Sequence, residues 1–263
     1  MVLPTDDRKC VAVVLAGQRP GVDPLAAHFG VALKALVPVG GQAMLARVVA
    51  TLLAHPMVAR VVIVSQARDG FAGLPGLDDG RVDHAAGGDS VSGALAGAME
   101  GIGAYPYLVT TADNVLIDAA MISHFVARAT AEPADLAVAV VERRVLEAAY
   151  PGNRRTWLRF RGGAYSGANL FWFASPRALA VLRLWQRIEQ ERKRGRAVIG
   201  AFGPLMLAAV GLRLASLGQA LRWAGRRLGV KAAAVEMPMA EACIDVDKLD
   251  DHALAEAILA RRA

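Results

Sequence analysis

Cysteine is scarce in this sequence, whose 263 residues include only Cys10 and Cys243. Their spacing excludes a cysteine metal site, and two thiols within apolar runs are typical of a protein from a reducing compartment. The first ten residues carry charges where a signal peptide needs an apolar core, so the cytoplasm is the expected location. The chain shows no repeats and no low-complexity linker. We therefore expect one domain over residues 1–263.

Aromatic residues are also few, at 6%. The net charge of +6 raises the question of nucleic-acid binding, for which aromatic side chains matter. Proteins that bind nucleic acid interleave aromatic side chains with their cations, and here only Trp185 and Trp223 lie near the main basic cluster. A solvated helix face explains the cluster better, and nucleic acid is not an expected partner. The cluster consists of Arg183, Arg187, Arg192, Lys193, Arg194 and Arg196, followed by Arg222, Arg226 and Arg227.

The common nucleotide-binding fingerprints are missing, since the sequence matches neither the P-loop nor the G-x-G-x-x-G pattern. What is present is an apolar run, CVAVVLAG, that starts at Cys10 and breaks at Gly17. A run of this kind predicts a strand buried on both faces of a parallel sheet. The glycine-rich stretch after it contains Arg19 and leads to Lys34. Backbone N–H groups and cations in such a turn bind phosphates, although an ordinary loop with a solvated lysine remains an alternative.

Apolar strand-like and helix-like segments alternate through the first half of the chain. This alternation predicts a three-layer α/β/α, Rossmann-like fold with a mainly parallel mixed sheet. The expected strands are 10–17, 60–65, 107–111, 136–141, 156–160, 168–173, 231–236 and 243–246. The expected helices are 42–54, 90–102, 117–131, 176–194 and 250–262. Residues 1–150 would form the alternating first half, and residues 151–263 a second half with a helical insertion at about 176–230.

Residues 198–217 form a strongly apolar stretch whose length approaches that of a membrane span. Glycines and a proline interrupt it and argue against a span. Packed helices are the first interpretation, and a surface that touches lipid is the second.

Aspartates follow two of the expected strands. Asp113 comes directly after the strand 107–111, and Asp245 and Asp247 lie at the end of 243–246. Ligands bind outside the carboxyl ends of the strands in such sheets, and Mg²⁺ prefers carboxylates together with phosphate oxygens. A turn or a helix cap is the plain alternative for any one aspartate. Together with the basic loop, these residues predict a Mg²⁺-nucleotide site.

Five segments in order resemble the MobA-like nucleotidyltransferases, a superfamily that includes sugar-phosphate nucleotidylyltransferases and alcohol-phosphate cytidylyltransferases. The segments are VLAGQRPG, KALVPVGGQAMLARV, GGDSVSGAL, TTADNVLI and IDVDKLDDHALAEAIL. The resemblance implies the GT-A-like nucleotidyltransferase fold and a Mg²⁺-dependent reaction. It further implies that residues 1–150 are the nucleotide-binding half and residues 151–263 the acceptor-binding half. In the family the position of Gln18 is a glycine, and the loop to Lys34 is shorter.

The resemblance also implies roles for individual residues. Catalysis would fall to Lys34 on the α-phosphate, Arg19 on the β- and γ-phosphates, and Asp113. The nucleotide would contact Leu15, Ala16, Gly17, Gln18, Gly87, Gly88 and Ser90. The metal ligands would be Asp113, Asp245 and Asp247, and the acceptor pocket would include Gly167 and Asn169.

The expected activity is transfer of a nucleoside monophosphate from a nucleoside triphosphate to a phosphorylated sugar, polyol or related alcohol, with release of pyrophosphate. A lipid precursor as acceptor and peripheral membrane contact are both compatible with this activity. A GT-A glycosyltransferase is one alternative, but Ala112-Asp113-Asn114 lacks the first aspartate of a D-x-D motif. A nucleotide sensor without catalysis is a second, motivated by Gln18. A membrane-surface adaptor is a third.

Overall fold

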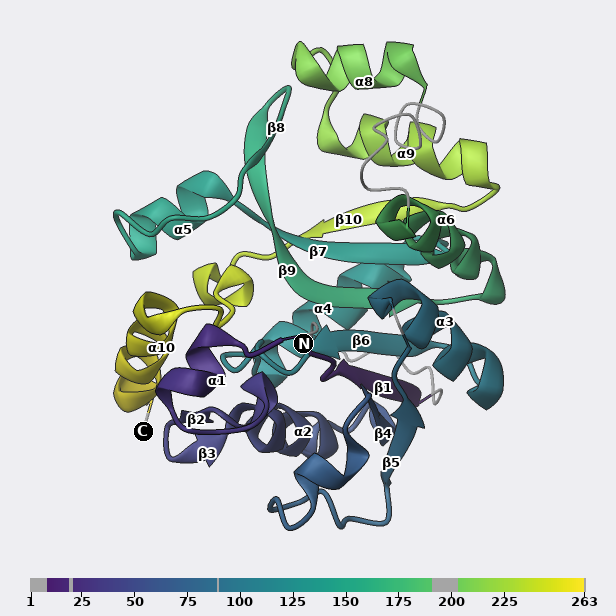
Figure 1. Ribbon diagram of the computed structural model, residues 1–263. Coiled ribbons are helices and arrows are strands. Elements are labelled where there is room, and N and C mark those ends of the chain that lie inside the picture. Colours follow the sequence, from purple (N-terminus) through teal and green to yellow (C-terminus); the bar gives the residue numbers. More distant parts are fainter. Residues whose placement is uncertain (1–8, 19–20, 89, 191–202, 263) are drawn as a thin grey trace.

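The first strand sits in the middle of the sheet and is buried on both faces. β1 (Cys10–Leu15) pairs in parallel with a strand on each side. Cys10, Ala12 and Val14 point into one hydrophobic cluster, and Val11 and Val13 point into the other. The apolar run is thus explained by helices on both faces, as the sequence predicted. This computed structural model describes residues 9–18, 21–88, 90–190 and 203–262 (Figure 1).

An eight-stranded sheet runs through the described residues in the order β10-β7-β9-β6-β1-β4-β5, with β8 paired to β9. The strands around β1 are parallel, as is the β10–β7 pair, whereas β9 runs antiparallel to its neighbours. The remaining strands are β4 (Val58–Ser65), β5 (Val82–Ala86), β6 (Tyr107–Thr111), β7 (Leu136–Glu142), β8 (Leu158–Phe160), β9 (Gly163–Phe173), β10 (Ala232–Glu236), and the small pair β2 (Pro38–Val39) and β3 (Gln42–Ala43).

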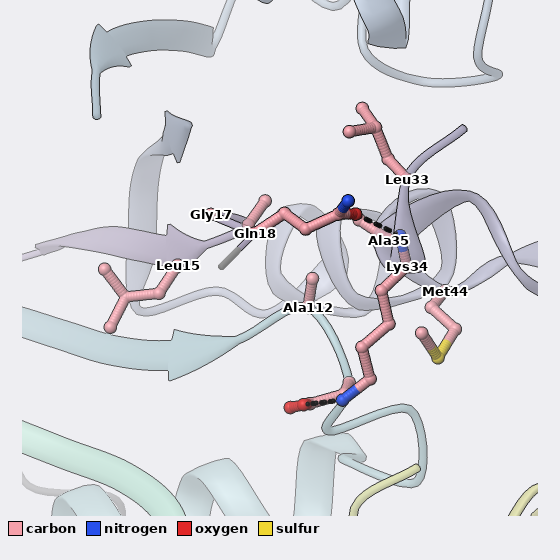
Figure 2. A pocket seen from close by; sticks show the side chains of 10 residues that line it. Leu15, Gly17, Gln18, Leu33, Lys34, Ala35, Met44 and Ala112 are labelled. Atoms are coloured by element: carbon pink, nitrogen blue, oxygen red, sulfur yellow. Dashed lines mark hydrogen bonds and ion pairs between the residues drawn. The ribbon is translucent and has the colours of Figure 1, made fainter. Parts of the chain in front are cut away.

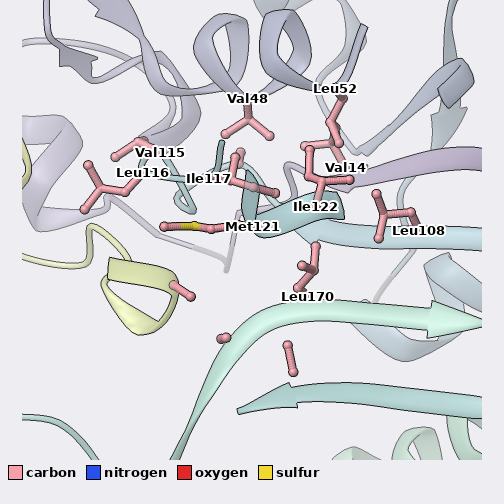
Figure 3. Packing of buried hydrophobic residues seen from close by; sticks show 14 of the residues in the cluster. Val14, Val48, Leu52, Leu108, Val115, Leu116, Ile117, Met121, Ile122 and Leu170 are labelled. Atoms are coloured by element: carbon pink, nitrogen blue, oxygen red, sulfur yellow. The ribbon is translucent and has the colours of Figure 1, made fainter. Parts of the chain in front are cut away.

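Helices cover both faces of this sheet, which confirms the three-layer α/β/α fold. One face packs against α1, α2, α4 and α10, and the other packs against α3 and α6 (Figure 1). Figure 3 shows the first interface, where Val48 and Leu52 of α2 and Met121 and Ile122 of α4 meet the sheet. The helices are α1 (Pro24–His28), α2 (Met44–Ala54), α3 (Val91–Ile102), α4 (Ala119–Ala131), α5 (Arg143–Ala149), α6 (Leu179–Gln190), α8 (Pro204–Gly211), α9 (Leu217–Leu228) and α10 (Leu249–Arg262), with 3₁₀ turns η1 (Lys34–Leu36), η2 (Arg68–Phe71), η3 (Pro176–Ala178) and η4 (Ala240–Cys243).

The expected strand over residues 243–246 was wrong. The chain there leaves η4 and runs without regular structure to α10. A single backbone hydrogen bond, from Val246 N to the carbonyl of Asp113 at 3.1 Å, attaches it to the loop after β6. An apolar run without a neighbouring strand cannot form a ladder. In a strand, side chains two residues apart lie on one face, and Asp245 and Asp247 would have done so. Without the strand, this alternation is absent.

The second half of the chain adds a part that lies beyond the β10 edge of the sheet (Figure 1). The apolar stretch at 198–217 contains α8 in its described portion, and α8 packs against β8 and α9 (Figure 1). We refer to β8, α8, α9 and the turns between them as the projection. Packed helices were the first interpretation of this stretch and are what the structure shows from residue 203 onward. No helix among the described residues is long and apolar enough to cross a membrane.

Candidate active site

A pocket lies at the carboxyl ends of β1 and β6, between the loop after β1, the turn η1 and the loop after β6 (Figure 2). This is the edge of the sheet where ligands of parallel α/β folds bind. The pocket is lined by Leu15, Ala16, Gly17, Gln18, Leu33, Lys34, Ala35, Met44, Ala112 and Asp113. The structure thus brings together the strand end, Lys34 and Asp113, which lie far apart in the sequence.

Lys34 is the central cation of this pocket. Its Nζ donates to Asp113 Oδ2 at 2.7 Å and to Asp247 Oδ1 at 2.5 Å. Burial alone would lower the pKa of Lys34, but the charges and hydrogen bonds of the two carboxylates outweigh it, and the pKa is raised. Lys34 therefore stays protonated, and it bridges the carboxylates that the sequence assigned to a metal.

Asp113 is fixed by its own loop. Its Oδ1 accepts a hydrogen bond from Thr111 Oγ1 at 2.5 Å, while Oδ2 faces Lys34. Its carbonyl accepts the hydrogen bond from Val246 that holds the segment before α10 at the site. Through this contact the end of the chain reaches the middle of the sheet.

Asp245 faces a second cation, Arg155, which the sequence analysis missed. Arg155 Nη1 forms an ion pair with Asp245 Oδ1, and Asn169 Nδ2 donates to Oδ2 at 3.0 Å. Burial raises the pKa of Asp245, and the charges of Asp113 and Asp247 raise it further, whereas Arg155 lowers it. Together these effects raise the pKa of the Asp245 carboxyl above its ordinary value. Three carboxylates thus interact around this site, balanced by two cations.

Asn169 reaches Asp245 because of an irregularity in β9. The register between β7 and β9 shifts between Val138 and Val140, and Asn169 there adopts φ +46°. Such bulges often redirect a side chain beside an active site. Its carbonyl is held by Thr110 Oγ1 at 2.9 Å. Gly167 lies opposite Val140, and a Cβ atom on it would meet open space.

Gln18, which replaces the family glycine, connects the loops of the site. Its Oε1 accepts from Lys34 N at 3.0 Å, as drawn in Figure 2, and its Nε2 donates to the carbonyl of Gly21 at 3.3 Å. Gln66, at the end of β4, accepts from Gln18 N and donates to the carbonyl of Gly88 at 3.1 Å. Gln18 thus fixes the conformation of the longer loop between β1 and Lys34. Gln66 is another residue of the site that no sequence motif indicated.

The second glycine-rich loop follows β5. A Cβ atom at Gly87 would come within 3.0 Å of the backbone of Ser65 and Gln66, so only glycine fits there without a shift. Ser90 caps α3, since its side chain accepts from Gly93 N at 3.1 Å. The expected nucleotide contacts of Gly87, Gly88 and Ser90 stay predictions. Arg19 lies outside the described residues.

The three possible metal ligands are engaged in ion pairs with two cations, Lys34 and Arg155. Among the described residues, no three histidine, cysteine or carboxylate side chains are gathered closely enough to hold a metal ion as they stand.

The two thiols take no part, because burial raises the pKa of Cys10 to about 12 and that of Cys243 to about 11. Asp118, one turn beyond Asp113, caps α4 by accepting from Met121 N at 2.8 Å.

Comparison with known families identifies the family of the chain. The pattern of the MobA-like NTP transferase domain matches residues 12–205. The chain belongs to this family. The match covers most of β1, η1 and the loop after β6, and it makes the chain a nucleotidyltransferase enzyme, as the sequence motifs indicated. No curated protein sequence matches this chain.

Solved structures agree with the fold. A hypothetical transferase from Thermus thermophilus is 29% identical with a TM-score of 0.77, covering 93% of this chain and 99% of its own. CMP:2-keto-3-deoxy-manno-octonic acid synthetase in complex with CTP is 14% identical, with a TM-score of 0.61 and coverage of 97% and 100%. A 4-diphosphocytidyl-2C-methyl-D-erythritol synthase is 14% identical, with a TM-score of 0.56 and coverage of 96% and 99%. At these lower identities the likeness concerns the fold alone.

Proposed function

We propose that this nucleotidyltransferase joins the phosphate of a phosphorylated sugar, polyol or related alcohol to the α-phosphorus of a nucleoside triphosphate. The observation that carries the proposal is the placement of Lys34 between Asp113 and Asp247 at the end of β1. One protonated amine there faces both the carboxylates and the loop expected to hold phosphates. The site is thus built to balance a high density of negative charge.

The donor set fits a Mg²⁺ ion. Asp113 and Asp247 offer oxygen ligands close enough to share one cation, and Asp245 is within reach of their charges. Oxygen ligands of this kind, combined with phosphate oxygens and water, are what Mg²⁺ prefers. When bound, the ion would neutralise charge on the triphosphate and on the leaving pyrophosphate. Asp113 and Asp247 would hold it, with Asp245 beside them, once Lys34 turns to the phosphate.

The reaction needs positioning more than proton transfer. An oxygen of the acceptor phosphate, already an anion, forms the new bond to the α-phosphorus. The bond from that phosphorus to the bridging oxygen breaks, and pyrophosphate leaves with the electron pair. Lys34 would stabilise the charge on the α-phosphate. Leu15, Ala16, Gly17, Gln18, Gly87, Gly88 and Ser90 would hold the nucleotide, with Arg19 on its outer phosphates, and Gly167 and Asn169 would line the acceptor pocket.

The test is pyrophosphate release with CTP, UTP, GTP, ATP and dTTP, each with Mg²⁺ and a panel of sugar and polyol phosphates. CTP comes first because two of the structural neighbours are named for cytidylyl chemistry or hold CTP. Release that requires one triphosphate and one acceptor is the expected result, and EDTA should abolish it. Nucleotide binding without turnover on any acceptor would favour a sensor. Sugar transfer from a nucleotide sugar would contradict the proposal.

Two variants test the residue assignments. Lys34→Ala and Asp113→Ala should each lower turnover by about 10²–10³, the usual effect of removing a group that stabilises developing charge. The matched control is Lys9→Ala, since Lys9 is exposed at the opposite end of β1. Circular dichroism should show all three variants folded. Substantial turnover in either folded site variant would remove that residue from the mechanism.

A further inference from the structure

A stripe of leucines faces solvent on the outermost helix of the projection. Leu205 is 86% exposed and Leu212 is 70% exposed, and both lie on α8 or at its end. Ala208 lies between them at helical spacing and is also exposed, so the three share one face of the helix. Leu214, which follows α8, is 62% exposed, and Leu158 of the adjacent strand β8 is 59% exposed.

The inner face of α8 already has its partners. Met206, Leu207 and Val210 are half-buried on the side that packs against β8 and α9. Glycine and leucine end the helix at Gly211 and Leu212, and no charged residue occurs from 203 to 212. The outward leucines are therefore in excess of what the fold of the projection needs. A large exposed apolar patch on one helix marks an interaction surface.

The charged residues of the projection itself have one sign, and the nearest acids beside Arg222 and Arg226 are Glu132 and Glu236, which line the same pocket from outside the projection. No aspartate or glutamate occurs from 148 to 188 or from 203 to 235. The same parts of the chain place a set of exposed arginines on β8, on α9 and in the turns beside α8. These are Arg159, Arg161, Arg213, Arg222 and Arg226. Arg161 Nη2 donates to Gln219 Oε1 at 3.3 Å, which joins the β8 turn to α9.

We propose that the projection docks on an anionic lipid surface, with the leucines of α8 inserted and the arginines at the headgroups. Apolar side chains flanked by cations are the combination by which helices bind membrane interfaces. α8 has 8 residues, far fewer than the roughly 20 that span a bilayer, so it would lie in the interface. Its outermost position lets it meet a flat surface first (Figure 1).

Charge complementarity selects this occupant over a second copy of the chain. A symmetric contact would place the arginines of one projection against those of the other, with no acid on either to pair with them. Anionic headgroups supply the missing charge. The proposal concerns a surface remote from Lys34 and Asp113, and its test measures binding alone, so it stands or falls separately from the proposed reaction.

The test is co-sedimentation of the full chain with vesicles of phosphatidylcholine, with or without about 30% phosphatidylglycerol. Binding should require the anionic lipid and should weaken between about 0.1 and 1 M NaCl, where the Debye length falls severalfold. No sedimentation with anionic vesicles, or equal binding to neutral ones, would overturn the proposal.

Paired variants separate the two contributions. Leu205→Asn with Leu212→Asn should lower the partition coefficient by about tenfold or more, because burying one leucine is worth about that factor. The control is Leu249→Asn, an exposed leucine at the start of the acidic first turn of α10. Equal binding of the double variant and the parent would contradict insertion.

The arginines are tested in the same way. Arg222→Gln with Arg226→Gln should weaken binding to anionic vesicles by about thirtyfold, since each of the two cations near the surface contributes about 1 kcal/mol. Arg68→Gln with Arg128→Gln, two exposed arginines on η2 and α4, should leave binding unchanged. Sedimentation equilibrium completes the set. A dimer that the leucine double variant dissociates would assign the stripe to a second copy and overturn the lipid proposal.

Discussion

Arg155 is a buried cation that pairs with two carboxylates beside the site. Its side chain is 9% exposed and lies between Asp245 and Asp251, whose side chains are 22% and 7% exposed. Its Nη2 also donates to the carbonyl of Asp245 at 3.3 Å. One guanidinium thus ties the segment before α10 to the loop before β8. Without it, two largely buried carboxylates would lose their counter-charge.

Replacing Arg155 should therefore cost stability as well as activity. Arg155→Gln is expected to lower the free energy of unfolding by about 3 kcal/mol, because it strands buried charge. Urea unfolding measures this. The matched control is Arg159→Gln, an exposed arginine on β8 that should change stability by less than about 0.5 kcal/mol. Equal effects of the two substitutions would show that the ion pairs of Arg155 contribute little.

At the scale of elements, two helical glycines differ in what surrounds them. Gly225 in α9 packs against the chain that enters β10, and a Cβ atom on it would fall on the carbonyl oxygen of Val230. Gly97 in α3 faces open space. α9 can pack against the chain entering β10 only because Gly225 has no side chain. In α3, a side chain at Gly97 would meet no neighbour.

The same substitution should have opposite signs at these two positions. Gly97→Ala is expected to stabilise the protein by about 0.5–1 kcal/mol, the difference in helix propensity. Gly225→Ala should destabilise it by about 1–3 kcal/mol, since α9 must shift from β10. Thermal unfolding of both variants measures the difference. A stabilised Gly225→Ala protein would contradict the close packing of α9 on β10.

The sequence predicted the elements whose pattern is local. Apolar runs gave β1, β4, β6 and β7 within a few residues, because strands buried on both faces have no polar side. The 243–246 run is also mostly apolar but lacks a neighbouring strand, and pairing is not visible in composition. Short elements such as α1 and α5 have too few turns to show a period.

Only part of the site could be predicted from the sequence. Lys34 and Asp113 follow recognisable segments, and both line the pocket. Arg155 and Gln66 lie in ordinary loop or strand-end sequence, and only the folded chain brings them to the site. The pairing of Asp245 with Arg155 depends on side-chain geometry that no spacing rule contains.

On the scale of the whole molecule, β9 joins the two halves of the chain. It inserts between β6 and β7 and pairs with both. The first half of the chain, residues 1–150, therefore cannot complete its sheet without a strand from the second half. Separate folding of the halves would leave the edges of β6 and β7 unpaired.

We therefore expect the chain to unfold as one cooperative unit. Differential scanning calorimetry should show a single transition, with equal calorimetric and van't Hoff enthalpies. The fragment 1–150 should aggregate or lack a cooperative transition, whereas the full chain should not. Two resolved transitions in the full chain, or a stable fragment, would show that the halves are independent domains.

The central place of β9 also matters while the protein is being made. β6 ends at Thr111 and its partner β9 ends at Phe173, about 60 residues later. At a synthesis rate of 5–20 residues per second, the nascent chain waits roughly 3–12 s with the edge of β6 open. During that interval the finished parallel strands already lie outside the ribosome. A newborn chain is thus most exposed to wrong pairing and to chaperones just before β9 emerges.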